Sequence, residues 1–475
     1  MNAMPLWTRA ETLAATRGRA TGDDWTATGV SIDSRTVAPG DLFVALSGPN
    51  HDGHDYVAAA FAKGGAAAIV QRVPADISAT APLIVAADTL ASLNDLAMAA
   101  RARAGARVVA VTGSVGKTGT KEMLKLALGA EGLTYATEGN LNNHWGVPLS
   151  LARLPREARF AVFELGMNHA GEITPLTRLV RPHVAVITAV EATHLEFFAS
   201  TAEIADAKAE IFRGVEPGGT AILPRDNRHY AQLEAAARTE GVARIESFGR
   251  HIESTARLLD AAVDPAATLV FAMFGDHPIG YRVGAAGMHW ASNSLAVLLA
   301  ARAAGVSVEA AAGALANMVA PKGRGARRSL AWDDGHIELI DDSYNASPAS
   351  MRAAIATLGA ARPAKHGRRI AVLGDMLELG VASKELHSGL TGPLDEWNID
   401  LVITAGPTMR HLHDALPERR RGGHAADADA ARILVRKSLR AGDVVLVKGS
   451  AGSRMGSVVK AIEQAQPGVT AQGEG

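Results

Sequence analysis

The segment from Arg107 to Lys125, RVVAVTGSVGKTGTKEMLK, constrains the fold of this chain more than any other. Val108, Val109 and Val111 form a short β-branched run, which is typical of a strand covered on both faces. The glycines that follow allow backbone N–H groups to close around an anion, and the next helix presents its positive end to the same point. A strand, a glycine-rich turn and a helix in this order predict a site for nucleotide phosphates.

This turn matches a shortened phosphate-binding pattern, TGSxGK[ST], because Val111 stands where the usual pattern has a glycine. Lys117 supplies a mobile positive charge for the terminal phosphates, and the Thr118 hydroxyl can ligate Mg²⁺. The alternative is a glycine turn that contains Lys and Thr by chance, but the flanking strand and helix favour phosphate binding. The residues that we expect to bind the nucleotide here are Gly113, Ser114, Val115, Gly116, Lys117, Thr118 and Gly119.

Composition bounds the class of protein. The chain has 475 residues, 48% hydrophobic and 20% charged, as expected for a soluble globular protein of two or three domains. A net charge of −1 without long basic runs gives no indication of nucleic acid or an anionic membrane as partner. The absence of cysteine excludes disulfides and thiolate chemistry. Residues 1–20 lack a secretory apolar core, and no apolar stretch could span a bilayer, so we expect a cytoplasmic protein without membrane insertion.

Strand-like and helix-like runs alternate along the chain, which predicts three α/β units, the second with a mostly parallel sheet. We expect strands at 29–35, 40–46, 66–70 and 82–86 and helices at 55–63 and 89–103 in the first unit. After the phosphate-binding strand, the second unit has expected strands at 159–166, 183–190 and 219–226. The third unit has expected strands at 336–343, 368–376, 400–406 and 443–450. The Gly- and Arg-rich tract PKGRGARR at 321–328 reads as the linker before it, and the tail from Gln466 as disordered.

Three more residues of the second unit are candidates for chemistry. Glu164 ends the strand FAVFELG, where a phosphate-transfer site needs a carboxylate for Mg²⁺, and the polar loop after it favours a site over a solvated glutamate. His194 follows the strand VITAV, but a lone histidine is more often structural. Lys208 lies in the helical run DAKAEIF, where the pattern by itself favours a solvated lysine beside acidic neighbours.

Two further observations concern the base and the third unit. No N-K-x-D guanine signature occurs, which favours adenine over guanine. The strand at 336–343 runs into LIDDSYNASP, whose polar groups indicate either a ligand site or an Asp that caps the next helix, with Ser347 and Pro348 at its start. The residues alone favour neither alternative.

With these motifs in order, the chain resembles the Mur ligase family over nearly its full length. The likeness rests on DSRTVAPGDLFVALSG and DGHDYV in the first unit, and on TGSVGKT, GNLNNHWGVP, ELGMNHAGEI, the His194 loop and AKAEIF in the second. DDSYNASP, VLGDMLELG and KGS in the third unit complete it. Several motifs in the right order are far more specific than any one of them.

The resemblance implies an N-terminal domain for the UDP end of a substrate (1–104), a central ATPase domain (105–320) and a Rossmann-like C-terminal domain (321–475). It implies ATP and two Mg²⁺ ions as cofactors, and possible carbamylation of Lys208. The implied catalytic residues are Lys117, Glu164, His194 and Lys208, and the implied metal ligands are Thr118, Glu164, His194 and Lys208. Asn293 and Asp342 would contact ATP, and Ser34, Arg35, Asn142 and Asn143 would bind the substrate.

The implied reaction is the ATP-dependent addition of D-Ala-D-Ala to UDP-N-acetylmuramoyl-tripeptide through an acyl phosphate, in peptidoglycan synthesis and hence in cell shape and division. The resemblance also suggests a monomer. A rival within the family is the ligase that adds the third amino acid, but its DNPR signature is absent from the third unit. A nucleotide-dependent switch is a rival from another class, and Glu164, His194 and Lys208 favour metal-assisted chemistry over it.

Four features depart from the pattern that is common in the family, among them Ser347 in place of a second Asn in DSYNASP and a His194 loop, HLEFFAS, without the usual glycines. The other two are single residues near the expected nucleotide site. Gly119 stands where Ser or Thr is common, and Trp290 follows His289 where Asn is common. Because Thr118 is kept, the first departure leaves the expected Mg²⁺ ligand in place.

Overall fold

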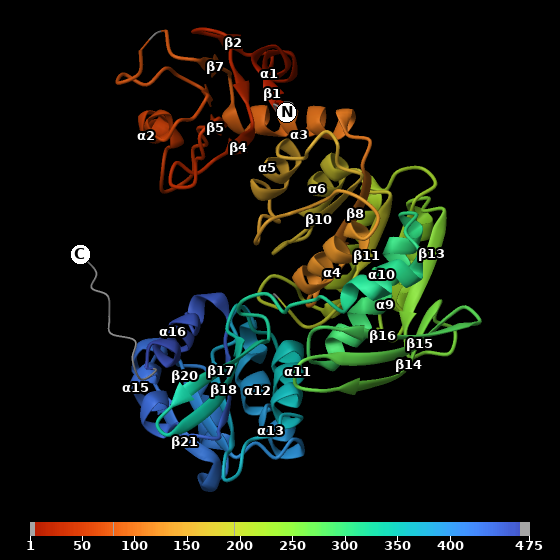
Figure 1. Ribbon diagram of the computed structural model, residues 1–475, viewed down its shortest axis with the longest axis vertical. Helices are drawn as coiled ribbons and strands as arrows, with labels where there is room; N and C mark the ends of the chain where they lie inside the picture. Colours follow the sequence, from red (N-terminus) through yellow and green to blue (C-terminus); the bar gives the residue numbers. More distant parts are fainter. Residues whose placement is uncertain (1–4, 79, 194, 466–475) are drawn as a thin grey trace.

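The computed structural model describes residues 5–78, 80–193 and 195–465. Three α/β domains follow one another along the chain and form a crescent, with the N-terminal and C-terminal domains at its two ends (Figure 1). The predicted fold class is therefore confirmed. Two sequence-based expectations, for His194 and for the tail from Gln466, lie outside the described residues.

The N-terminal domain is built on a sheet of strand order β2-β7-β6-β5-β4, in which β4 to β7 run parallel and β2 pairs antiparallel with β7. A short antiparallel pair, β1 with β3, lies beside it. The strands are β1 Trp7–Thr8, β2 Arg19–Ala20, β3 Thr26–Ala27, β4 Gly29–Ser31, β5 Asp41–Val44, β6 Ala67–Val70 and β7 Leu83–Val85, and the helices are α1 Arg9–Thr16, α2 Val57–Ala62 and α3 Thr89–Arg103.

The central sheet has the order β16-β15-β14-β13-β12-β11-β8-β10-β9. Its strands are parallel from β9 to β14, and β15 and β16 extend it as antiparallel edge strands, which the sequence analysis did not anticipate. The strands are β8 Arg107–Thr112, β9 Thr134–Ala136, β10 Phe160–Glu164, β11 Val184–Ile187, β12 Thr220–Pro224, β13 Arg244–Gly249, β14 Ala256–Val263, β15 Thr268–Phe274 and β16 His277–Val283. The helices are α4 Lys117–Gly129, α5 Gly146–Ala152, α6 Ile173–Val180, α7 Thr201–Ala209, α8 Tyr230–Thr239, α9 Met288–Ala303 and α10 Val308–Leu315.

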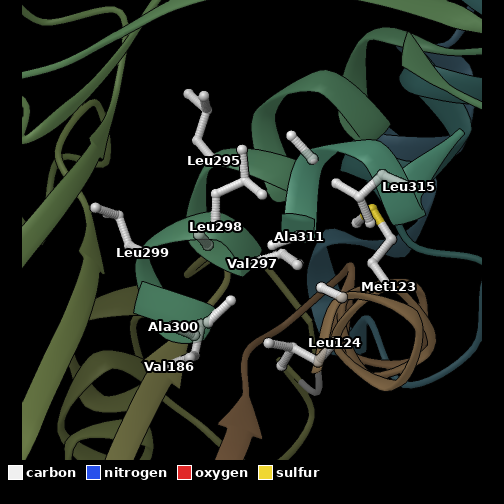
Figure 2. Packing of buried hydrophobic residues seen from close by; sticks show 14 of the residues in the cluster. Met123, Leu124, Val186, Leu295, Val297, Leu298, Leu299, Ala300, Ala311 and Leu315 are labelled. Carbon is white, nitrogen blue, oxygen red and sulfur yellow. The ribbon is translucent and has the colours of Figure 1, made fainter. Parts of the chain in front are cut away.

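The helix that follows the phosphate-binding turn packs into the core of this domain. Figure 2 shows Met123 and Leu124 of α4 facing Val297 of α9 and Leu315 of α10. All four side chains are fully buried. Burial of an aliphatic side chain contributes roughly 1.5–3 kcal/mol, so this contact holds α4, and with it the turn at its N-terminus, against the rest of the domain.

The C-terminal sheet has the order β17-β18-β22-β19-β20-β21, with β17 antiparallel and the other strands parallel. The predicted linker at 321–328 is partly wrong, because strand β17 begins at Ala326. Strand β17 pairs with β18 and so covers the edge of β18. The strands are β17 Ala326–Trp332, β18 Gly335–Asp342, β19 Arg369–Gly374, β20 Leu401–Ala405, β21 Arg421–Ala425 and β22 Val444–Lys448. The helices are α11 Pro348–Gly359, α12 Ser383–Ser388, α13 Thr391–Glu396, α14 Arg410–Ala415, α15 Ala428–Ser438 and α16 Gly456–Gln464.

The N-terminal domain is fixed to the central one by buried polar contacts. The indole Nε1 of Trp7 donates to the carbonyl of Ala152 at 2.9 Å, and Nε of Arg153 donates to the carbonyl of Val30 at 2.6 Å. Helix α3 packs along α5 at the same junction. In the described ranges, no helix combines the length and apolarity needed to cross a membrane.

Candidate active site

The phosphate-binding turn has the backbone that its glycines predict. Gly113 and Gly116 both have positive φ, +149° and +87°, a region that side chains with a Cβ seldom adopt. A Cβ on Gly113 would lie 1.9 Å from Oγ1 of Thr188, and one on Gly116 would lie 2.7 Å from Nδ2 of Asn293. The turn therefore needs glycine at both positions for conformation and for space.

Residues after β11 brace the turn from the side. The hydroxyl of Thr188 donates to the carbonyl of Val115 at 2.6 Å. The Ser114 hydroxyl donates to the carbonyl of Glu191 at 3.1 Å and accepts from the Glu191 N–H at 3.0 Å. These bonds hold the backbone N–H groups of the turn in place before any anion binds.

Lys117 lies at the first position of α4, and its Nζ donates to the carbonyl of Gly113 at 2.7 Å. Burial lowers the pKa of Lys117; the nearby Glu164 carboxylate opposes that shift and the Arg324 guanidinium adds to it. An anionic phosphate beside Lys117 would oppose this shift and favour the charged form of the amine.

Glu164 ends β10 beside the turn, and only 2% of its surface is exposed. Its Oε2 accepts from the Thr118 hydroxyl at 2.8 Å, and its Oε1 accepts from Nδ2 of Asn142 at 2.8 Å. The structure thus brings Thr118, Asn142 and Glu164 together. Asn143 does not join them, because its side-chain oxygen accepts from the N–H groups of Trp145 and Gly146 at the start of α5.

The prediction from pattern alone that Lys208 is solvated is wrong. Lys208 is only 2% exposed, and its acidic neighbours have other partners: Asp206 accepts from Gln232, and Glu210 accepts from the N–H groups of Gly171 and Thr174. Burial lowers the pKa of Lys208 far below its usual value, and the charge of Lys117 lowers it further. Both burial and the nearby phosphate-binding lysine therefore favour the uncharged form of Lys208.

The C-terminal domain closes the other side of the site. A cavity of about 680 Å³ is lined by the phosphate-binding turn, by the start of α9 with Asn293, and by the ends of β18 and β22. At those ends Nζ of Lys448 donates to Oδ2 of Asp342 at 2.7 Å and to the carbonyl of Asn345 at 2.9 Å. Burial raises the pKa of Asp342, and Lys448 opposes that rise.

The open question about LIDDSYNASP is resolved by the start of α11. Ser347 caps this helix through a reciprocal pair with Ser350, so neither Asp341 nor Asp342 is its cap. Asp341 instead accepts from the Ser343 hydroxyl at 2.6 Å and pairs with Arg328. Asp342 is left facing the cavity.

Arg324 was not predicted as a site residue, because it lies within the tract 321–328, whose composition is typical of a linker. Gly323 and Gly325 on either side have φ of +74° and +85°. Arg324 lines the cavity, with its guanidinium 4.1 Å from the ring centre of Tyr344. The signal that could have found it is an arginine between two glycines next to a polar strand end.

Two predicted substrate residues lie in the N-terminal domain, away from this cavity. The Arg35 side chain is 86% exposed and forms an ion pair with Asp33 at 2.7 Å, and Ser34 lies beside it. His194 lies outside the described residues. Among the residues that are described, no group of three or more His, Cys, Asp or Glu side chains is arranged to hold a metal ion.

Comparison with known proteins identifies related sequences and folds. Three family models match the chain: Mur ligase family, catalytic domain, at residues 26–107; Mur ligase middle domain at 111–301; and Mur ligase, glutamate ligase domain, at 323–451. The UDP-N-acetylmuramoyl-tripeptide–D-alanyl-D-alanine ligase of Escherichia coli is 36% identical, over 94% of this chain and 96% of its own. The ligase of the same name from Rickettsia prowazekii is 32% identical, over 90% and 94%.

Solved structures agree with these sequence matches. A crystal structure of MurF from Acinetobacter baumannii superposes with a TM-score of 0.83 at 32% identity, covering 96% of this chain and 99% of its own. The MurF ligase from Thermotoga maritima in complex with ADP gives a TM-score of 0.76 at 28% identity, covering 92% and 97%. With its phosphate-binding turn, its buried carboxylate and lysine, and these matches along nearly its whole length, the chain belongs to the Mur ligase family.

Proposed function

We propose that this chain is an ATP-dependent, ADP-forming ligase that joins D-alanyl-D-alanine to UDP-N-acetylmuramoyl-tripeptide and so makes the pentapeptide precursor of peptidoglycan. The main support for this proposal is that one cavity is lined both by the phosphate-binding turn and by the strand ends of the C-terminal domain. The relatives that bear this activity in their names match at least nine-tenths of the chain. We assign residues 1–104 to the UDP end of the substrate, 105–320 to ATP and 321–475 to closing the site.

In the proposed reaction, a carboxylate oxygen of the tripeptide forms a bond to the γ-phosphorus of ATP and ADP leaves. The N–H groups of the turn at 113–118 hold the phosphates, and Lys117 neutralises the charge that builds on the transferred group. The amine of D-Ala-D-Ala then attacks the acyl carbon, and the tetrahedral intermediate expels phosphate. We propose that Asn293, Arg324 and Asp342, which line the cavity around the turn, contact the nucleotide.

The residues beside the turn fit Mg²⁺. The Thr118 hydroxyl and the Glu164 carboxylate are the hard oxygen ligands that this ion prefers, and among the described ion pairs none involves Glu164. We propose that these two residues hold one Mg²⁺ ion and that His194 and Lys208 help to hold a second. When bound, Mg²⁺ supplies positive charge to the phosphoryl oxygens.

Lys208 fits carbamylation. Its amine is buried, and burial lowers its pKa well below the usual value, which favours the neutral, nucleophilic form of the amine. In this modification the nitrogen of the neutral amine bonds to the carbon of CO₂ and loses a proton, which leaves an anionic carbamate. We propose Asn142 and Asn143, with Ser34 and Arg35, for the UDP-linked substrate, and we expect a cytoplasmic monomer.

The test is phosphate release with ATP and Mg²⁺, leaving out UDP-N-acetylmuramoyl-tripeptide and D-Ala-D-Ala in turn. Release that needs both, with the pentapeptide identified by mass, is the expected result. Release with the UDP substrate and a different amine would move the enzyme to a sister activity. Release that needs neither substrate would indicate a plain ATPase or a switch and would refute the proposal.

A further inference from the structure

The loop that follows β19 forms a wall of the cavity to which the proposed reaction assigns no role. Its sequence, GDMLELG, is one of the motifs of the C-terminal domain. Leu377, Glu378 and Leu379 line the cavity. The carbonyl of Glu378 accepts from the N–H of Glu196 at 3.2 Å, which ties the loop to the central domain. The loop therefore lies where the two domains meet.

This loop is held in a conformation that it would not adopt by itself. Glu378 has a φ of +61°, which is uncommon for a residue other than glycine and persists only where neighbouring contacts enforce it. The Leu377 N–H donates to Oγ of Ser450 at 3.0 Å, and the Ser450 N–H donates to the carbonyl of Asp375 at 3.0 Å. These bonds join the loop to the end of β22, the strand next to β19 in the sheet.

His387 lies behind the loop and is completely buried. Its Nδ1 is 2.6 Å from the carbonyl of Ser383, and its Nε2 is 3.0 Å from the N–H of Met376. Because a carbonyl can only accept and an amide N–H can only donate, Nδ1 carries the hydrogen and Nε2 is the acceptor. Burial lowers the pKa of His387, which agrees with a neutral ring.

We propose that His387 is a positioning residue for the amine substrate: through the N–H of Met376 it holds the loop at 376–379 as the wall against which D-Ala-D-Ala binds. This inference rests on the proposed function. The phosphates take the side of the cavity formed by the turn at 113–118, and the Asp342–Lys448 pair occupies the ends of β18 and β22. The remaining part of the cavity is lined by Ser450, after the end of β22, and by the loop after β19. We assign this part to the second substrate, because it lies at the edge of the sheet where such folds hold ligands.

The experiment uses the full-length enzyme with three substitutions of His387 that separate its two ring nitrogens. His387→Phe keeps the ring shape and removes both contacts. His387→Gln can place an acceptor near the Nε2 position, whereas His387→Asn replaces only the Nδ1 contact. A matched control is His413→Phe, a partly buried histidine of α14 in the same domain that does not line the cavity. For each we measure kcat, the KM of all three substrates, and hydrogen exchange of the segment 374–382.

His387→Phe and His387→Asn should raise the KM for D-Ala-D-Ala roughly tenfold, the effect of leaving one buried N–H without an acceptor. The KM values for ATP and for the UDP substrate should stay near those of the wild type, and exchange at 376–379 should speed up. His387→Gln and the His413→Phe control should resemble the wild type. Equal changes in all three KM values, or a His387→Gln as impaired as His387→Phe, would overturn the positioning role.

The wild-type enzyme distinguishes a failure of the proposed function from a failure of the positioning role of His387. If it makes no pentapeptide from D-Ala-D-Ala, the proposed function is refuted. If hydrogen exchange at 376–379 is unchanged in His387→Phe, the hold of His387 on the loop is refuted whatever the substrate.

Discussion

Gly119 and Trp290, two of the positions that depart from the family's common residues, lie against each other in the structure. A Cβ on Gly119 would lie 2.9 Å and 3.1 Å from two carbons of the Trp290 indole, which is itself 3% exposed. Carbon atoms in contact are about 3.5–4.0 Å apart. Gly119→Ser would therefore force the indole or the first turn of α4 to move by several tenths of an ångström.

The expected cost follows from two opposing effects. Overpacking a dense core costs about 1–3 kcal/mol, and replacing a helical glycine returns about 0.5–1 kcal/mol. We expect Gly119→Ser to lower the free energy of unfolding by about 1 kcal/mol, the centre of the difference between these two effects, which spans about 0–2.5 kcal/mol. Because Gly119 follows Thr118 and Trp290 lines the cavity, we also expect weaker binding of ADP.

The assay is denaturant unfolding and ADP titration of Gly119→Ser, Trp290→Asn and the double variant. Trp290→Asn alone should cost about 3 kcal/mol or more through the cavity that it leaves. In the double variant the serine has room, so its cost should be smaller than the sum of the two single costs by at least about 1 kcal/mol. Gly129→Ser is the control, because it lies at the end of the same helix with nothing within 4 Å of the new Cβ. Additive costs, or a Gly119→Ser as stable as the control, would refute the reasoning.

Three further predictions concern charged groups. Lys117→Ala should abolish phosphate release yet leave the affinity for the UDP substrate nearly unchanged by calorimetry, and equal loss of both would contradict the domain assignment. Lys208→Ala should be inactive and regain part of its activity with added acetate or formate, so wild-type rates without the additive would exclude the carbamate. Burial, assisted by Arg107, lowers the pKa of His183 to about 4 from 6.5, and its Nδ1 accepts from the Val108 N–H. Because the unfolded chain binds this proton at a higher pH than the folded chain, the free energy of unfolding should rise with pH between about 4 and 6.5. His183→Asn, which keeps an acceptor, should weaken that rise in denaturant titrations at pH 4.5 and 7; an equal rise in both proteins would exclude His183 as its source.

Local sequence was sufficient where the chemistry is carried by consecutive residues. The strand, glycine turn and start of a helix at 107–125 were predicted because both their hydrophobic pattern and their glycine spacing are local, and the structure has β8, the turn and α4 in these places. The three α/β units follow from the same kind of signal. The capping of α11 by Ser347 was less certain, since the Asp residues before it offer the same hydrogen-bond acceptor.

The edge strands and the burial of single polar residues could not be read from the sequence. Strand β17 has arginines at consecutive positions, and only its pairing with β18 makes it a strand. The acids on either side of Lys208 make it look solvated in the sequence. In the structure Asp206 and Glu210 pair instead with residues that are dozens of positions away, and the sequence pattern does not show those partners.

The sequence by itself determined the family, the α/β class and the phosphate-binding turn, because each depends on residues that are close together in the chain. The tertiary structure alone decided which side chains share the site. Asn142 reaches Glu164, and Arg324 and Lys448 line the cavity. Asn143 turns away and accepts from the N–H groups of Trp145 and Gly146. The physical reason is that burial and hydrogen-bond partners depend on which strand ends and loops the fold brings to one edge of a sheet. The spacing of residues along the chain does not determine which of these distant segments meet.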